Sequence, residues 1–164
     1  MTIRFGILTL SDRSSRGERE DASGPALAQL IRAQNWSIAR EKILPDELSV
    51  IRATLTEWAD SGEMDVILTT GSTGFAARDV APEATRAVIQ RDTPGLVETM
   101  RAESLKMTPH AMLSRAIAGI RGRTLIINLP GSPTGAVENL QTVIPVLSHA
   151  VQLLKEDPSS ESSH

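Results

Sequence analysis

A loop of small residues follows a short apolar segment and leads to an arginine–aspartate pair. The apolar segment begins at Asp65, the loop runs from Gly71 to Gly74, and Arg78-Asp79 follow four residues later. Because glycine has no Cβ, such a loop can bring backbone N–H groups close to an anion. A carboxylate beside the loop can hold a hard cation next to that anion. These residue types are the ones needed to handle a nucleotide or another phosphate ester.

The residues of this loop leave two interpretations open. Residues 71–74 form either a phosphate cradle or a tight turn after a strand. They match neither the Walker A motif, which ends in Gly-Lys-Ser/Thr, nor the dinucleotide fingerprint, which needs a third glycine. Asp79 is either a magnesium ligand or a carboxylate that accepts from nearby backbone N–H groups. Arg78 pairs either with a phosphate or with a surface carboxylate.

Three further stretches place polar side chains next to apolar segments. Asp46 precedes a helical periodicity, so it is either a helix N-cap or a carboxylate of the site. Ser11-Asp12-Arg13 ends the first apolar segment and has the composition of an ordinary polar loop. Gly131-Ser132-Pro133 resembles either plain turn chemistry or an anion site at a helix start, where free N–H groups and the helix dipole favour negative charge.

Short apolar segments alternate with helical periodicities along the chain. The pattern predicts strands at residues 3–10, 36–43, 66–70, 116–120 and 125–127. It predicts helices at residues 26–31, 48–59, 82–89, 94–105 and 137–154, the last broken or bent near Pro145. This alternation indicates a layered α/β fold with a mostly parallel sheet. The polar loops should then share one sheet edge, because ligands of such sheets bind beyond the carboxyl ends of the strands.

Other segments carry weaker signals. Residues 11–24 and the stretch after Thr108 are expected to be loops. The methionines at positions 100, 107 and 112 are expected to fill the core. The three histidines, His110, His149 and His164, lie far apart and show no metal-ligand spacing.

The composition is that of a soluble globular protein. The chain has 164 residues, of which 40% are hydrophobic and 23% charged, and the net charge is −3. We expect one domain over residues 1–155 and a flexible polar tail over 156–164. With no cysteine, disulfides, thiolate zinc sites and thiol nucleophiles are excluded. With no long apolar stretch, we expect a cytoplasmic protein that does not associate with membranes.

Nucleic-acid binding is disfavoured by the same totals. Aromatic residues are scarce, with two Trp, two Phe and no Tyr, whereas single-stranded nucleic acids are bound by stacking bases on aromatic side chains. The sequence has no basic block that would neutralise the phosphates of a duplex. No nucleic-acid partner is therefore expected.

Taken together in this order, the motifs resemble those of the MogA/MoaB-type molybdenum cofactor biosynthesis proteins. That family includes the G domains of gephyrin and of its plant relative. The resemblance extends from about Ile3 to Leu154. The matching stretches are Ser11-Asp12-Arg13, residues 21–25, Pro45-Asp46, residues 69–74, Arg78-Asp79, residues 82–84, Ser114-Arg115 and residues 128–133.

The resemblance implies a three-layer α/β/α fold that assembles as a homotrimer. It also implies an activity, molybdopterin adenylylation, in which the terminal phosphate of molybdopterin attacks the α-phosphorus of MgATP and pyrophosphate leaves. The product, molybdopterin-AMP, would pass to a partner protein that inserts molybdate. The residues implied as catalytic and magnesium-binding are Asp46 and Asp79. Those implied for nucleotide or phosphate binding are Ser11, Asp12, Gly71, Ser72, Thr73, Gly74 and Arg78, and those for pterin binding are Ser114, Gly131 and Ser132.

Two positions depart from the family pattern. Ser72 stands where a second glycine is usual, so its backbone must adopt angles open to a residue with a Cβ, or be strained. Its hydroxyl could instead donate to a phosphate. Ala81 stands where threonine is common, and a lost N-cap there would cost about 1 kcal/mol. Alternatives to the adenylyltransferase are a non-catalytic molybdopterin-binding protein of the same fold and a different nucleotide or phosphate-ester enzyme.

Overall fold

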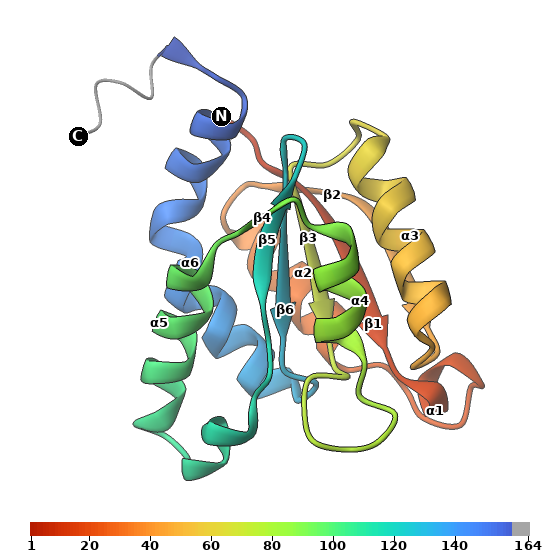
Figure 1. Ribbon diagram of the computed structural model, residues 1–164. Helices are drawn as coiled ribbons and strands as arrows, with labels where there is room; N and C mark the ends of the chain where they lie inside the picture. Colours follow the sequence, from red (N-terminus) through yellow and green to blue (C-terminus); the bar gives the residue numbers. More distant parts are fainter. Residues whose placement is uncertain (159–164) are drawn as a thin grey trace.

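A mixed β-sheet of six strands runs through the middle of residues 1–158, the part of the chain that the computed structural model describes (Figure 1). The strand order is β2-β1-β3-β6-β5-β4. The strands are β1 (Arg4–Leu10), β2 (Ser37–Leu44), β3 (Val66–Thr70), β4 (Arg91–Asp92), β5 (Ala118–Arg121) and β6 (Thr124–Leu129). Strands β2, β1, β3 and β6 are parallel, whereas β5 pairs antiparallel with both β6 and β4. The predicted α/β class and the mostly parallel sheet are confirmed.

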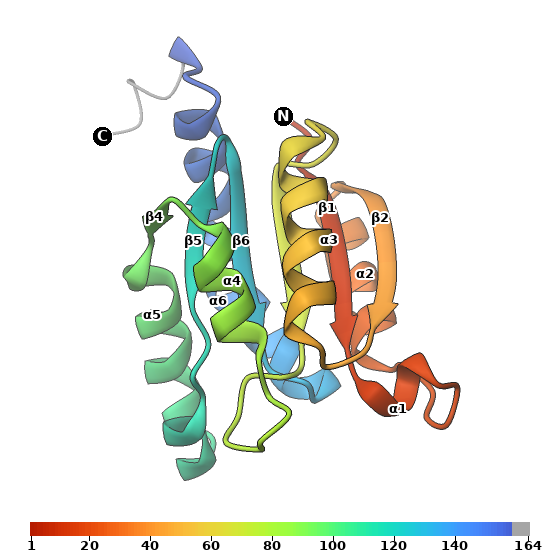
Figure 2. The ribbon, with the colours of Figure 1, turned by 45° about the vertical axis from the view of Figure 1, so that its right-hand side comes forward.

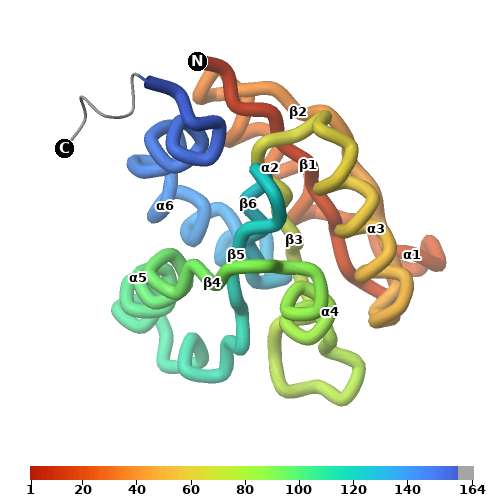
Figure 3. Tube along the Cα trace, turned by 45° about the horizontal axis from the view of Figure 1, so that its top comes forward, coloured from red at the N-terminus to blue at the C-terminus, as the bar shows by residue number. Residues whose placement is uncertain are grey.

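Helices cover both faces of the sheet. They are α1 (Asp12–Ser15), α2 (Ser23–Ala33), α3 (Leu48–Asp60), α4 (Ala81–Val88), α5 (Pro94–Leu105), the 3₁₀ helix η1 (Pro109–Leu113) and α6 (Pro133–Leu154). Helices α2, α5 and α6 pack into one hydrophobic cluster and α3 and α4 into the other. Figure 2 shows α3 and α4 in front of the sheet, and Figure 3 shows α5 beside α6. The structure therefore has the three layers that the family resemblance implied.

The central strands are apolar on both sides because each side packs against helices. In β1, Phe5 and Ile7 belong to the cluster under α2 and α6, and Leu8 belongs to the cluster under α3 and α4. The same alternation separates Leu68 from Ile67 in β3. Successive side chains of a strand point to opposite faces, so a doubly covered strand reads as an unbroken apolar run.

The parallel strands all end at one edge of the sheet. There β1 leads into α1, β3 into the loop 71–80 and β6 into residues 130–132, as Figures 1 and 2 show. The N-terminus lies at the opposite edge. The prediction that the three polar loops share one edge is confirmed. Within the described residues, no helix combines the length and apolar character that a membrane crossing requires.

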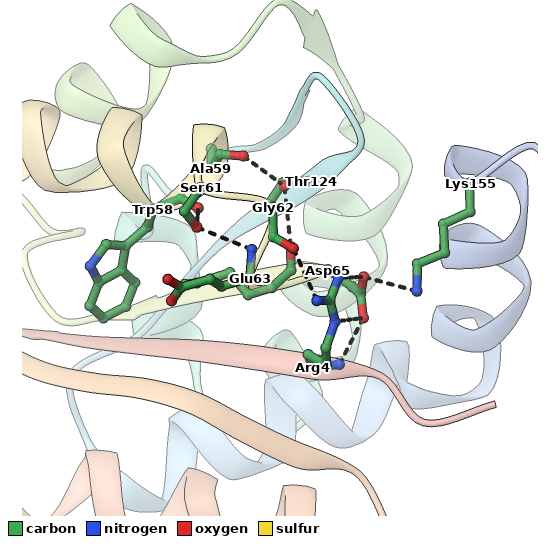
Figure 4. Close-up of polar contacts among 10 residues, drawn as sticks. Arg4, Trp58, Ala59, Ser61, Gly62, Glu63, Asp65, Thr124 and Lys155 are labelled. Carbon is green, nitrogen blue, oxygen red and sulfur yellow. Dashed lines mark hydrogen bonds and ion pairs between the residues drawn. The ribbon is translucent and has the colours of Figure 1, made fainter.

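A cluster of three charged side chains, Arg4, Asp65 and Lys155, lies at the opposite edge of the sheet (Figure 4). The buried carboxylate of Asp65 accepts from the side chain and the backbone N–H of Arg4, and it lies 3.1 Å from Nζ of Lys155, at the end of α6. Burial raises the pKa of Asp65, but the hydrogen bonds from Arg4 and Lys155 outweigh it and hold that pKa below its usual value. The cluster thus ties the end of α6 to the starts of β1 and β3.

Three helix starts differ from the sequence predictions. The predicted polar loop 11–24 contains the short helix α1, which Ser11 caps. The N-cap interpretation of Asp46 is wrong, because Glu47 occupies the N-cap position of α3. The N-cap of α4 is Val80, and Ala81 is the first residue of the helix. Alanine at position 81 therefore does not remove an N-cap.

Other differences concern short elements and exposure. Strand β4 has two residues and η1 five, so neither carries a recognisable periodicity. Helix α6 begins at Pro133, earlier than predicted, and continues unbroken through Pro145. Met100 is buried as expected, but the side chains at positions 107 and 112 are 72% and 66% exposed and fill no core. The tail expected over 156–164 lies mostly outside the described residues, as does His164.

Candidate functional site

The loops after β3 and β6 pack directly against each other. Gly71 has a φ of +98°, and a Cβ there would lie 2.5 Å from the carbonyl oxygen of Leu10. A Cβ at Gly131 would lie 3.2 Å from Cα of Gly71. The hydroxyl of Thr70 donates to the carbonyl oxygen of Pro130 at 2.7 Å. Only glycine allows so close an approach, which leaves backbone rather than side chains at the carboxyl edge of the sheet.

A cavity of about 440 Å³ opens at this edge, and we call it the carboxylate cavity. Asp46 and Asp79 both line it, together with Gly71 and Ser72. Its wall also includes residues from the β1–α2 connection and from the start of α6, among them Ser11, Arg19, Asp21, Gly131 and Ser132. Two carboxylates 33 positions apart in sequence therefore face one hollow beside the glycine loop, as the sequence predicted.

Asp46 is held by Asp12 through a reciprocal pair of hydrogen bonds. The N–H of Asp12 donates to Oδ2 of Asp46 at 2.9 Å, and the N–H of Asp46 donates to Oδ1 of Asp12 at 3.0 Å. Arg78 donates to both carboxylate oxygens of Asp12 at 2.9 Å. This bond to Arg78 is the main reason that the pKa of Asp12 lies below its ordinary value. Asp12 and Arg78 line neither cavity of the site, and their pairing supports Asp46 from outside.

Asp79 has one oxygen in a turn. Its Oδ2 accepts from the N–H of Ala76 at 3.1 Å, and a Cβ at Gly74 would lie 2.9 Å from that oxygen. Within residues 1–158, its Oδ1 accepts no hydrogen bond. The turn role proposed from sequence is therefore present, and it leaves one oxygen available to the cavity. Gly74 lacks a side chain where the carboxylate needs room.

Ser72 adopts the strained conformation that its position suggested. Its φ is +62°, in the left-handed region that favours glycine. Its Oγ accepts from the N–H of Val80 at 2.9 Å and donates to the carbonyl oxygen of Arg78 at 3.4 Å. The hydroxyl therefore closes the loop that carries Asp79, and these bonds offset part of the cost of the left-handed backbone.

Arg115 holds the same loop from the other side. Its Nε donates to the carbonyl oxygen of Gly74 and its Nη2 to that of Asp79, each at 2.7 Å, and its side chain also pairs with Glu83 of α4. Its backbone N–H donates to the carbonyl oxygen of Thr73 at 2.8 Å. Sequence reasoning missed this role, because the pattern Ser114-Arg115 directed attention to the serine. No local spacing links Arg115 to a loop 36 residues earlier.

A second cavity, of about 300 Å³, adjoins the first, and we call it the apolar cavity. Helix α5, η1 and the start of α6 supply its walls, which include Val97, Met100, Met107, Leu113, Ser114 and Asn128. Thr73 and Gly74 border it, whereas Gly71 and Ser72 border the carboxylate cavity. Ser132 lines both cavities. The arrangement suits a ligand pair, one polyanionic and one with an apolar part.

Three of the four candidate serines cap local structure. The hydroxyl oxygens of Ser11, Ser114 and Ser132 accept from backbone N–H groups two or three residues later, at 3.1, 3.3 and 3.0 Å. Each hydroxyl keeps its own hydrogen for donation to an anion. Ser132 caps the 22-residue helix α6, whose positive dipole end thus meets both cavities.

The site's donor set fits a magnesium ion that shares a phosphate ligand. Residues 1–158 contain no cluster of three His, Cys, Asp or Glu side chains able to hold a metal by themselves. Magnesium commonly takes one or two protein carboxylates and completes its shell with water and substrate phosphates. Asp46 and Asp79, lining one cavity, match that need.

Comparison with known proteins shows the family of the chain. The family described as probable molybdopterin binding domain matches residues 6–149. The chain belongs to this family. It is 46% identical over 160 residues to the molybdenum cofactor synthesis protein cinnamon of Drosophila melanogaster, covering 96% of this chain but only 26% of that protein. The chain thus spans about a quarter of that relative.

Two other matches extend over nearly the whole of both chains. The molybdopterin adenylyltransferase of Helicobacter pylori is 43% identical over 155 residues, covering 93% of this chain and 88% of that protein. The crystal structure of the molybdopterin biosynthesis enzyme MoaB of Thermus thermophilus has 49% sequence identity and a TM-score of 0.90, covering 96% of this chain and 99% of that one. These likenesses confirm the predicted family and its fold.

Proposed function

We propose that this chain is a molybdopterin adenylyltransferase, which transfers AMP from MgATP to the terminal phosphate of molybdopterin. The observation that carries the proposal is the shared cavity of Asp46 and Asp79 beside Gly71, joined to an apolar cavity at Ser132. The Helicobacter pylori relative of that name supports it, since it is similar along 88% of its length.

The reaction needs positioning and charge neutralisation more than proton transfer. A phosphate oxygen of molybdopterin forms a bond to the α-phosphorus of ATP, and the bond from that phosphorus to the oxygen that leaves with pyrophosphate breaks. The nucleophile is already ionised at neutral pH, so no strong general base is required. The site accordingly offers carboxylates, backbone N–H groups and serine hydroxyls. Its main task is to hold two polyanions within bonding distance.

The proposed nucleotide site is the carboxylate cavity. Asp46 and Asp79 would hold Mg²⁺, and when bound this ion neutralises charge on the triphosphate. The backbone of Gly71 and Ser72, the start of α6 and the hydroxyl of Ser11 would bind phosphate oxygens there, whereas Thr73 and Gly74 line the apolar cavity. Asp12 and Arg78 contribute by fixing Asp46 through the hydrogen bonds described above.

The proposed pterin site is the apolar cavity. Its methionine, valine and leucine side chains suit a flat heterocycle, and Ser114 and Ser132 offer polar partners. Because Ser132 lines both cavities and Gly131 lines the carboxylate cavity beside it, the terminal phosphate of molybdopterin would lie at Ser132. This places the attacking phosphate next to the nucleotide site.

A coupled assay tests the proposal. The protein is incubated with molybdopterin, ATP and magnesium, and pyrophosphate and adenylylated pterin are measured. We expect both products in equal amounts, and neither when one substrate is left out. ATP bound without any binding of molybdopterin would favour a different nucleotide enzyme and overturn the proposal.

The left-handed Ser72 favours one second candidate, a molybdopterin-binding protein without turnover. Its hydroxyl is engaged with Val80 and Arg78, so the loop lacks the freedom that a second glycine would give it. Molybdopterin binding with no pyrophosphate release would support this candidate.

Several further expectations belong to the same proposal. They are a homotrimeric assembly, a cytoplasmic location, transfer of the product to a molybdate-inserting partner and one domain over residues 1–155. The family resemblance supports the assembly and the transfer, and the family match over residues 6–149 supports the single domain. Sedimentation velocity with the purified protein tests the assembly, for which we expect a trimer.

A further inference from the structure

The carboxylate cavity has an uneven distribution of charge. Four acidic side chains line it, Glu20, Asp21, Asp46 and Asp79, and among residues 1–158 Arg19 is its single basic one. A triphosphate carries several negative charges, so the carboxylates that do not bind a metal ion repel it. The cavity wall therefore holds one side chain whose charge attracts phosphates directly.

Two other guanidinium groups near the site, those of Arg78 and Arg115, are engaged with protein groups. Arg78 is paired with both carboxylate oxygens of Asp12. Arg115 donates to the carbonyl oxygens of Gly74 and Asp79. Neither of these arginines lines the carboxylate cavity. If either arginine left its partners, the loops that carry the proposed catalytic carboxylates would lose hydrogen bonds. Neither is therefore available to bind a substrate.

Arg19 is placed differently. It lies exposed in the connection between α1 and α2, and its side chain makes no hydrogen bond or ion pair within the described residues. The nearby carboxylate of Asp21 is already used, because it accepts from the hydroxyl of Thr9 at 2.8 Å and the N–H of Gly24 at 3.1 Å. The guanidinium on the cavity wall is thus without a protein partner.

We propose that Arg19 binds the triphosphate of ATP, an inference that rests on the proposed function. A guanidinium presents parallel N–H donors that match two phosphate oxygens, and it stays charged at every physiological pH. Arg19 does not line the apolar cavity, where the pterin is placed. It is therefore a substrate-binding residue for the nucleotide and not for molybdopterin.

Calorimetric titration of MgATP into the wild type, Arg19→Ala, Arg19→Lys and Arg13→Ala tests this inference. Arg13 is the matched control, since it is an exposed arginine of α1 that does not line the cavity. We expect Arg19→Ala to raise the Kd for MgATP about tenfold, the effect of losing one hydrogen-bonded charge. Arg19→Lys should restore part of the affinity, and Arg13→Ala should bind as the wild type does. The melting temperature and the Kd for molybdopterin should not change.

Three results would overturn the role of Arg19 without affecting the proposed function. They are an unchanged Kd for MgATP in Arg19→Ala, an equal loss of MgATP affinity in Arg13→Ala, and a loss of affinity in Arg19→Ala that is confined to molybdopterin. A wild-type protein that binds no MgATP would instead overturn the proposed function itself. The wild-type titration comes first, so the two failures are distinguishable.

Discussion

Asp12 and Asp46 hold each other by two backbone-to-carboxylate hydrogen bonds, of 2.9 and 3.0 Å, across the ends of β1 and β2. Each aspartate thereby fixes the backbone of the other. Arg78 keeps Asp12 ionised and in place. The carboxylate in the cavity is thus oriented by one that stands outside it, and this relationship gives Asp12 a positioning role.

Asp12→Ala should lower kcat by about 10²-fold, because small displacements of a catalytic group have effects of that size. KM for ATP should change less, since Asp12 lines neither cavity of the site. Ser15→Ala is the matched control: it removes a hydroxyl on the same helix that bonds only to the carbonyl oxygen of Asp12. Steady-state kinetics of both variants checks this, and equal losses in the two would contradict the positioning role.

Asp79→Asn should fold normally and lose about 10²–10³ in kcat, the usual effect of losing one charge-stabilising contact. An asparagine can still accept from the N–H of Ala76, so the turn should persist. Turnover and melting temperature should be measured on the same preparation. Normal turnover would remove Asp79 from the mechanism.

Asp46→Asn distinguishes a catalytic role of Asp46 from a structural one. Because Glu47 and not Asp46 occupies the N-cap of α3, the substitution should leave the melting temperature nearly unchanged. The amide oxygen can still accept from the N–H of Asp12. We expect activity to fall as strongly as in Asp79→Asn. A large loss of stability with normal specific activity of the folded fraction would show a structural residue instead.

Arg115→Lys keeps the charge but cannot donate to Gly74, Asp79 and Glu83 together, since one ammonium replaces a planar fork. We expect kcat to fall at least tenfold while the fold is retained. The control is Arg40→Lys on β2, where Arg40 forms surface ion pairs with Glu57 and Glu63, and it should leave the kinetics unchanged. Comparable kinetics for the two lysine variants would contradict the role of Arg115.

The Asp65 cluster predicts a pH dependence of stability. The pKa of Asp65 is lower in the folded than in the unfolded protein, so its contribution is present above about pH 4 and is lost as the pH falls through the folded pKa. Asp65→Asn should cost about 2 kcal/mol at pH 7, the scale of hydrogen bonds to a charged group. Urea unfolding of both proteins should show that difference shrinking below pH 4. A difference that stays constant down to pH 3 would exclude this explanation.

Sequence patterns predicted the elements whose periodicity is long or strongly apolar. The central strands were predicted because burial on both faces makes them continuous apolar runs, and α5 was predicted because Pro94 begins it at the first helical position. The two-residue β4 could not be found, since two residues carry no period. Met107 was misjudged because its exposure at the rim of a cavity depends on tertiary packing.

The site was predictable in its residue types but not in its pairings. Motifs after the strands predicted that Asp46 and Asp79 lie at one edge of the sheet, because parallel topology brings strand ends together. No local pattern shows that Arg78 bonds to Asp12, 66 residues away. The role of Arg19 likewise depends on which other cations are already paired, and only the folded chain shows this.

Transfer of label from ATP tests the central claim most directly. The protein is incubated with molybdopterin, magnesium and ATP labelled with ³²P at either the α- or the γ-phosphate. Adenylyl transfer predicts that only the α-label appears on the pterin, with the γ-label released in pyrophosphate. Label from the γ-phosphate on the pterin, or no label from either, would contradict the account.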